Sequence, residues 1–270
     1  MNLKRESRTP LCMLRMMCLA AACVVLPRIV SGQILTVGLA RSVYLIKYGQ
    51  SFGTGFILHT GEKEYLVTAA HVVGGMKSGE KIGVRTGWDR WEEFAVTRVP
   101  IPSKVDIAVL VTDRPISLQG EWIEVGSTAG LDFNLAVHFL GFPYGGELNL
   151  NGRTYRLSSS YLKDGLSFPI ALVKHGVIAG WDNRDPDSRI IFIDAINNPG
   201  FSGSPVVFWD SLTKLPKVFG VVTARLPEQL MVPDGAPPPP LWDNSGIVIA
   251  HDISGALKAI QQYVRATSPK

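Results

Sequence analysis

The chain has 270 residues, of which 46% are hydrophobic and 19% charged, a balance that fits a globular protein with a sizeable core. Its formal net charge of +4 is carried by residues 1–32, which hold five basic side chains against one acidic, so the remainder is neutral. That neutrality excludes the basic surface that nucleic-acid binding requires, and we expect no nucleic-acid partner.

Residues 1–32 have the features of a secretory signal peptide. They combine a basic start, an apolar run over residues 11–26 interrupted only by Arg15, and the small pair Ser31-Gly32. The run is short for a membrane span and carries a charge, so a retained anchor is the second interpretation and lipidation at Cys23 the third. All three cysteines lie in this leader, so the mature chain would hold no disulfide. We therefore expect an exported protein, periplasmic or secreted, without a stable membrane span.

Residues 33–120 predict a first domain built of short strands. Runs of β-branched residues alternate with Gly, Pro and Asp, which is typical of a barrel or a sandwich. The strands are expected at Ser42–Lys47, Gly55–His59, Glu64–Ala69, Lys81–Arg85 and Asp106–Val111.

Turn residues between Asp113 and Asp132 mark the boundary to a second domain of the same kind, residues 121–251. Residues 252–270 follow as a helix and tail, because apolar side chains recur at helical spacing from Asp252 to Ala266. The Pro237–Pro240 tract is interpreted as a surface loop. Strands of the second domain are expected at Ala136–Leu140, Ile170–Lys174, Ile190–Ile193, Pro205–Phe208, Lys217–Val222 and Gly246–Ala250.

Three residues that could form a nucleophilic site occur in the order His71, Asp106, Ser202. A serine hydroxyl is a weak nucleophile that needs a neighbouring base, and a carboxylate can fix the tautomer of that base. Each residue lies next to a short apolar run, and this chain order is that of the chymotrypsin-type triad. The N–H groups of Gly200 and Ser202 are the candidate donors to a developing oxyanion. The other histidines lack metal-ligand spacing, so we expect neither a metal nor a cofactor.

These residues lie in motifs that resemble those of trypsin-like serine peptidases, especially the HtrA-like branch that lacks disulfides. The motifs are Gly53–Ile57, Val67–Val73, Asp106–Leu110, Gly141–Gly145, Asp194–Asn197, Gly200–Pro205 and Gly220–Val222. The resemblance implies an all-β fold of two six-stranded antiparallel β-barrels with a C-terminal α-helix. It also implies a catalytic cleft between the barrels and polypeptide substrates, contacted by Ile196, Gly220, Val221 and Val222.

Two positions depart from the family pattern, and a third bears on specificity. Ser204 stands where the family commonly has Gly, and we expect this small residue to be tolerated. Arg28–Gly32 looks like a zymogen activation site, but Phe201 occupies the position of the carboxylate that would bind the new amino terminus. Ile196 offers no charge to hold Lys or Arg, which predicts a small or medium apolar residue before the cut bond. No PDZ domain is expected after the barrels.

The sequence thus predicts a secreted or periplasmic serine endopeptidase that works through an acyl-enzyme. The alternative is a catalytically weak or silent trypsin-like domain that binds peptides or partners. An esterase on the same scaffold is a third interpretation. The sequence does not indicate an oligomeric state.

Overall fold

The computed structural model describes most of the chain beyond residue 36. The described ranges are 37–60, 63–87, 90–102, 104–117, 123–126, 132–156, 169–185, 189–229 and 242–267. The predicted signal peptide at residues 1–32 and the Pro237–Pro240 tract lie outside them. No helix within these ranges is long and apolar enough to cross a membrane.

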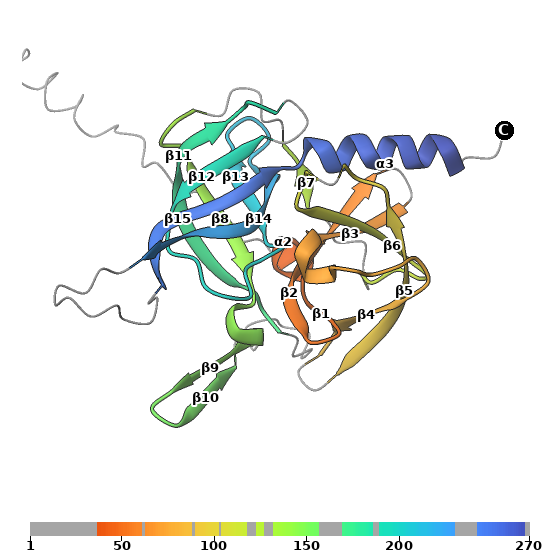
Figure 1. Ribbon diagram of the computed structural model, residues 1–270, viewed down its shortest axis with the longest axis horizontal. Helices are drawn as coiled ribbons and strands as arrows, with labels where there is room; N and C mark the ends of the chain where they lie inside the picture. Colours follow the sequence, from red (N-terminus) through yellow and green to blue (C-terminus); the bar gives the residue numbers. More distant parts are fainter. Residues whose placement is uncertain are drawn as a thin grey trace, which may run out of the picture. The chain divides into compact units, whose positions relative to one another are not determined.

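The first barrel is a closed ring of six antiparallel strands (Figure 1). Neighbouring strands pair in the order β1-β2-β3-β6-β5-β4, and pairing of β1 with β4 closes the ring. A short helix, α2 (Val37–Arg41), precedes β1 and was not predicted. The strands are β1 (Val43–Tyr48), β2 (Ser51–Thr60), β3 (Lys63–Ala69), β4 (Lys81–Arg85), β5 (Trp91–Val99) and β6 (Ile107–Thr112).

The second barrel is a ring in the order β13-β8-β11-β12-β15-β14, which closes because β13 also pairs with β14. The short strand β7 adds to this ring by parallel pairing with β14, and β9 and β10 form a separate hairpin (Figure 1). The strands are β7 (Glu124–Val125), β8 (Ala136–Gly141), β9 (Glu147–Leu150), β10 (Arg153–Arg156), β11 (Leu172–Asp182), β12 (Ile190–Asp194), β13 (Pro205–Asp210), β14 (Leu215–Gln229) and β15 (Trp242–Asp252).

Three clusters of buried apolar side chains fill the molecule. One lies within the first barrel and includes Ile57, Leu66 and Leu110, and another lies within the second. The third joins the two barrels, because residues of β2 and β3 share it with residues of β8, β14 and the C-terminal helix. Its members include Phe56, Tyr65, Leu140, Val221 and Ile260. Burial of apolar area thus couples the two rings as well as filling each one.

The C-terminal helix α3 (Ser254–Thr267) confirms the helix predicted at the end of the chain. Asp252 precedes it, and its Oδ1 accepts a hydrogen bond of 2.6 Å from the N–H of Ser254, satisfying a donor at the helix start. Ala256, Ala259 and Ile260 form its buried face, and the helix contacts β5 and β6. The second half of the chain therefore returns to the first barrel.

The predicted fold class, two six-stranded antiparallel barrels with a C-terminal helix, is confirmed. The last strand of the first ring ends at Thr112, and the first strand joined to the second ring begins at Glu124. Strand β5 and the β9–β10 hairpin were not predicted. Strand β11 was expected only at its start and extends to Asp182.

Candidate active site

His71 and Asp106 lie side by side because of how β3 pairs with β6. The two strands are antiparallel and Ala69 pairs with Ile107, so the end of β3 lies beside the start of β6. His71 follows β3 in a short 3-10 turn (Ala70–Val73), and Asp106 directly precedes β6. The ring Nδ1 of His71 is 2.7 Å from Asp106 Oδ2. The backbone N–H of His71 also donates to Asp106 Oδ1, over 3.0 Å.

The hydrogen bonds between His71 and Asp106 suit His71 to accept a proton. The hydrogen bond to Asp106 raises the pKa of His71 above its ordinary value of 6.5, and it outweighs the lowering caused by partial burial. The second contact, from the backbone N–H, holds the other oxygen of the same carboxylate. With Nδ1 bonded to Asp106, the other ring nitrogen is the one that a substrate or nucleophile would meet. The His71 side chain is 49% exposed, which leaves it accessible.

Ser202 follows a tight turn whose backbone conformation is dictated by its sequence. The N–H of Phe201 donates to the carbonyl of Asn198 over 3.3 Å, with Pro199 and Gly200 between them. Gly200 has φ of +101°, and Pro at the second position with a positive φ at the third defines a type II turn. A side chain at Gly200 would place its Cβ 2.3 Å from the Phe142 carbonyl oxygen. Only glycine therefore fits this position.

The peptide that joins Pro199 to Gly200 is held in one orientation. The Pro199 carbonyl accepts a hydrogen bond of 2.9 Å from the N–H of Tyr144. In a trans peptide the N–H points opposite to the C=O, and the described residues contain no cis peptide. The N–H of Gly200 is therefore directed away from Tyr144.

Thr54, on β2 of the first barrel, fastens the turn of the second barrel. Its N–H donates to the carbonyl of Ser202 over 2.8 Å, and its Oγ1 donates to the carbonyl of Gly200, also over 2.8 Å. The same Oγ1 accepts from the N–H of Phe142 over 3.1 Å. The motif around Thr54 was recognised in the sequence, but this clamping role was not.

The segments that carry His71 and Ser202 meet across Gly53. A Cβ at Gly53 would lie 2.7 Å from a methyl carbon of Val72 and 3.0 Å from the carbonyl oxygen of Ser202. Val72 directly follows His71, so the absence of a side chain at Gly53 allows both segments to approach the same point. All three predicted triad residues thus border the junction of the two barrels.

Behind Asp106 lies a polar pair that the sequence analysis missed. The Nδ1 of His251 is 3.0 Å from the Oγ1 of Thr223, and both residues are buried. Burial lowers the pKa of His251, while the negative charge of Asp106 acts in the opposite direction. Thr223 and His251 come from β14 and β15, and no local motif marks either of them. From the sequence, His251 had been counted only among the histidines that lack metal-ligand spacing.

The predicted substrate contacts fall into two groups. Ile196 is 62% exposed and open to a ligand. Gly220, Val221 and Val222 are buried, because the closed second ring covers that part of β14. Val222 instead supports the turn, since its carbonyl accepts from the N–H of Gly203 and its N–H donates to the carbonyl of Ser204. Beyond this buried stretch, β14 is exposed again at Ala224, and substrate contact at Gly220–Val222 stays a prediction.

The loop before Ser202 is tied down by Lys174 of β11. The Nζ of Lys174 donates to the carbonyl of Ile196 over 2.7 Å and to Oδ1 of Asn198. It also lies 5.2 Å from the centroid of the buried Phe201 ring. Partial burial lowers the pKa of Lys174. A lysine ammonium group therefore lies beside Phe201 and fastens the loop before Ser202.

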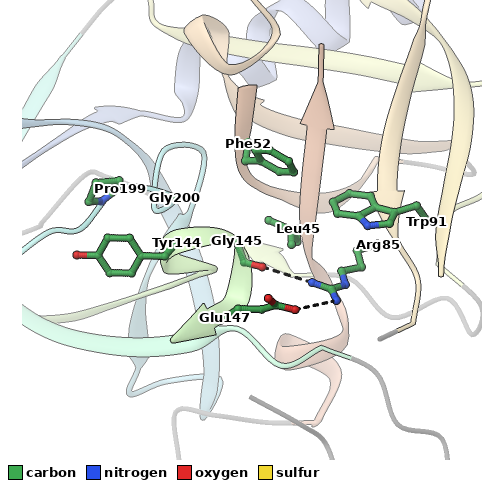
Figure 2. Close-up of a pocket in the computed structure, with 9 residues that line it drawn as sticks. All are labelled: Leu45, Phe52, Arg85, Trp91, Tyr144, Gly145, Glu147, Pro199 and Gly200. Carbon is green, nitrogen blue, oxygen red and sulfur yellow. Dashed lines mark hydrogen bonds and ion pairs between the residues drawn. The ribbon is translucent and has the colours of Figure 1, made fainter. Parts of the chain in front are cut away.

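A pocket of about 470 Å³, the aromatic pocket, lies beside the turn (Figure 2). Figure 2 shows Trp91 and Arg85 on one side of it and Tyr144 and Pro199 on the other. Arg85 is buried, donates to the Gly145 carbonyl over 3.4 Å and pairs with Glu147 at 3.8 Å. The lining residues are Leu45, Phe52, Arg85, Trp91, Tyr144, Gly145, Glu147, Pro199 and Gly200. In the described part of the chain, no group of three or more His, Asp or Glu residues is arranged to hold a metal ion.

Comparison with known proteins decides the family. The profile of the trypsin-like peptidase domain matches residues 53–211, more than half of the chain. The chain belongs to the trypsin-like peptidase family. The matched range includes all three predicted triad residues and the turn at Ser202. No curated protein matches the sequence of this trypsin-like chain.

Solved structures share the fold at low sequence identity. An inactive serine-to-alanine mutant of Rv3671c from M. tuberculosis H37Rv is 19% identical, with a TM-score of 0.53 over 90% of this chain and 96% of that one. The HtrA-type protease AlgW with a tripeptide is 21% identical, with a TM-score of 0.52 over 83% and 60%. A serine endoprotease from Yersinia pestis is 20% identical, with a TM-score of 0.53 over 84% and 64%. The trypsin-like chain thus spans less than two thirds of the latter two.

Proposed function

We propose that the chain is a serine endopeptidase that cuts polypeptides through an acyl-enzyme formed on Ser202. The observation that carries the proposal is the 2.7 Å hydrogen bond between His71 Nδ1 and Asp106 Oδ2, beside the glycine-rich turn of Ser202. Membership of the trypsin-like peptidase family supports it further.

The proposed reaction begins with attack of Ser202 Oγ on the carbonyl carbon of the peptide bond. His71 takes the hydroxyl proton on Nε2, and the imidazolium is stabilised by Asp106 through Nδ1–H. The negative charge on the former carbonyl oxygen is bound by the N–H groups of Gly200 and Ser202. Loss of one such donor ordinarily lowers turnover by about 10²–10³-fold.

The tetrahedral intermediate then collapses to the acyl-enzyme. His71 gives the proton to the leaving amine, which departs with the C-terminal part of the substrate. Water then attacks the ester carbonyl while His71 takes a proton from it, and return of that proton to Ser202 releases the second product. No cofactor is needed for any of these steps.

The same proposal includes an order of domains and an exported location. Residues 1–32 would serve as a signal peptide, followed by barrels over 33–120 and 121–251 and by the helix and tail over 252–270. The basic and apolar leader is the feature that supports export to the periplasm or beyond the cell. The exposed Ile196 supports a preference for a small or medium apolar residue before the cut bond.

The proposal is tested by labelling with a fluorophosphonate. The wild-type protein should react at one site, and Ser202→Ala should abolish the label. Ser78→Ala is the control, because Ser78 is exposed and its Oγ only accepts from the Arg98 N–H. A folded wild-type protein that takes no label would refute the proposal and favour a binding module. Casein and ester substrates assayed side by side separate an endopeptidase from an esterase.

A further inference from the structure

We propose that the aromatic pocket binds an aromatic side chain of the substrate from the segment that follows the cut bond. This inference rests on the proposed function, because the cut bond is placed by Ser202. It adds a second site of selection, distinct from the one at Ile196.

The position of the pocket determines which part of the substrate reaches it. Gly200 lines the pocket and also carries one of the proposed oxyanion donors, so the pocket lies beside the turn that would bind the reacting carbonyl. Phe52, another lining residue, precedes Gly53, which meets Val72 next to His71. Because His71 must protonate the leaving amine, the leaving segment passes on this side of the turn. Ile196, by contrast, does not line the pocket.

The lining favours a flat apolar group. Phe52 and Trp91 meet edge to face with ring centroids 6.2 Å apart, and Tyr144 lies on the opposite side of the pocket (Figure 2). Aromatic rings pack well in such edge-on arrangements. Leu45 and Pro199 add further apolar surface. The volume of about 470 Å³ is ample for one aromatic side chain together with water.

Charge at the pocket selects against other side chains. The guanidinium carbon of Arg85 lies 5.8 Å from the Trp91 ring, and Lys47 Nζ lies 4.5 Å from the same ring. These cations would repel a lysine or arginine of the substrate. An acidic side chain would have to compete with Glu147 for Arg85. An aromatic side chain would be neither repelled by these cations nor in competition with Glu147. The face of its ring would be attracted to the nearby guanidinium of Arg85.

The exposure of Phe52 and Tyr144 and the backbone conformation of Tyr144 indicate that the pocket binds a ligand. Phe52 is 51% exposed and Tyr144 is 59% exposed, although both are large apolar side chains. Tyr144 has a φ of +53°, in the left-handed region that bulky residues rarely adopt. Such strain is typical of functional sites. Here the N–H of Tyr144 holds the Pro199 carbonyl, and the Tyr144 ring lies on the Pro199 side of the pocket, directed away from Trp91 (Figure 2).

The test uses peptides that differ only at the two positions after the cut bond, which carry Phe, Ala, Asp or Lys. Phe should raise kcat/KM about tenfold over Ala, the discrimination that an apolar pocket commonly achieves. Phe52→Ala should remove most of that preference. Phe133→Ala is the matched control, because Phe133 is an exposed phenylalanine that stacks on Trp181, away from the pocket, and it should leave the preference intact. Equal rates for Phe and Ala, or a preference for Asp or Lys, would overturn the inference.

A binding measurement separates this inference from the proposed function. The Ser202→Ala protein is titrated with the uncut Phe and Ala peptides, followed by calorimetry. A Kd for the Phe peptide about tenfold lower, lost in the Ser202→Ala/Phe52→Ala protein, supports the pocket even if no peptide is ever cut. Absence of both cleavage and labelling would refute only the catalytic proposal. Equal Kd values for the two peptides would refute the pocket whatever the labelling result.

Discussion

His71 should set the dependence of activity on pH. A general base must be neutral, and the hydrogen bond to Asp106 raises the pKa of His71 above 6.5. We therefore expect kcat/KM to rise with pH and to reach half of its plateau above pH 6.5. Asp106→Asn should move this midpoint lower, because the bond that raises the pKa is lost while the lowering by burial remains. The plateau should also fall by about 10⁴-fold. A midpoint that does not respond to this substitution would contradict the assignment.

The raised pKa of His71 also affects the stability of the fold, and this effect changes with pH in the opposite direction to activity. A raised pKa in the folded state means that protonated His71 favours folding. This contribution is fully present below the unfolded-state pKa and is lost as the pH rises through the raised folded-state pKa. Activity is therefore gained over the pH range in which this contribution to stability is lost.

Gly203 is the position in the turn where a side chain should be most harmful. Its φ is +89°, and a Cβ there would lie 1.9 Å from the Thr54 carbonyl oxygen. Gly203→Ala should therefore lower the free energy of unfolding by more than ~3 kcal/mol, since backbone must move. Gly49→Ala is the control, with φ of +57° but nothing within 4 Å, and should cost only ~1 kcal/mol. Chemical denaturation measures both, and equal losses would contradict the argument.

For single residues, the sequence predicts the features that neighbouring residues determine, and few of those that depend on distant segments. Pro199-Gly200 predicts its turn because proline fixes one φ and glycine permits the other. The burial of Gly220–Val222 could not be predicted, because it depends on closure of a ring by distant strands. Thr223 and His251 could not be found, since only the pairing of β14 with β15 brings them together.

Strand β11 contributes to the site through Lys174, which fastens the loop before Ser202. Hydrogen bonds that involve a charged group contribute about 1.5–3 kcal/mol. Lys174→Met should therefore lower kcat about tenfold or more, with little change in KM, because fewer molecules hold the turn in its bonded form. Lys174→Arg should retain part of the activity, and Lys81→Met, at an exposed ion pair, should have no effect. Steady-state kinetics with a peptide substrate measure both parameters. A rise in KM alone would contradict a positioning role.

The elements that were predicted are those with unbroken apolar or β-branched runs. Strand β5 was missed because its residues alternate with charged ones, and only one of its faces is buried. The β9–β10 hairpin was missed because its strands are short and mix polar with apolar residues, and they pair only with each other. Strand β14 is longer than predicted, since its extension is held by pairing with β15.

The whole molecule should unfold in one transition. The third apolar cluster takes residues from both barrels and from α3, so neither ring can lose its packing alone. Ile260→Ala removes a buried member of that cluster and should cost ~2–5 kcal/mol. Gln262→Ala, on the exposed face of the same helix, is the control. Differential scanning calorimetry should give a single peak that moves down only for Ile260→Ala. Two separate peaks in the wild-type protein would contradict this coupling.

The number of barrels could be predicted from the sequence, but the packing of the two barrels against each other could not. Strand periodicity and the turn-rich boundary at residues 113–132 indicate two β-domains. Which strands close each ring depends on pairings between distant segments, such as β1 with β4. The return of α3 to the first barrel is likewise a long-range contact with no local signal.

The bonds from Thr54 to the turn have a consequence for when activity first arises. Thr54 is synthesised well before Ser202, whereas β15, which pairs with β12 and β14 to complete the second ring, emerges after it. The turn gains its supports from both rings only once that last strand has paired. A ribosome-bound chain that lacks β15 should therefore be inert. The cell that makes this peptidase would then meet no active enzyme during translation.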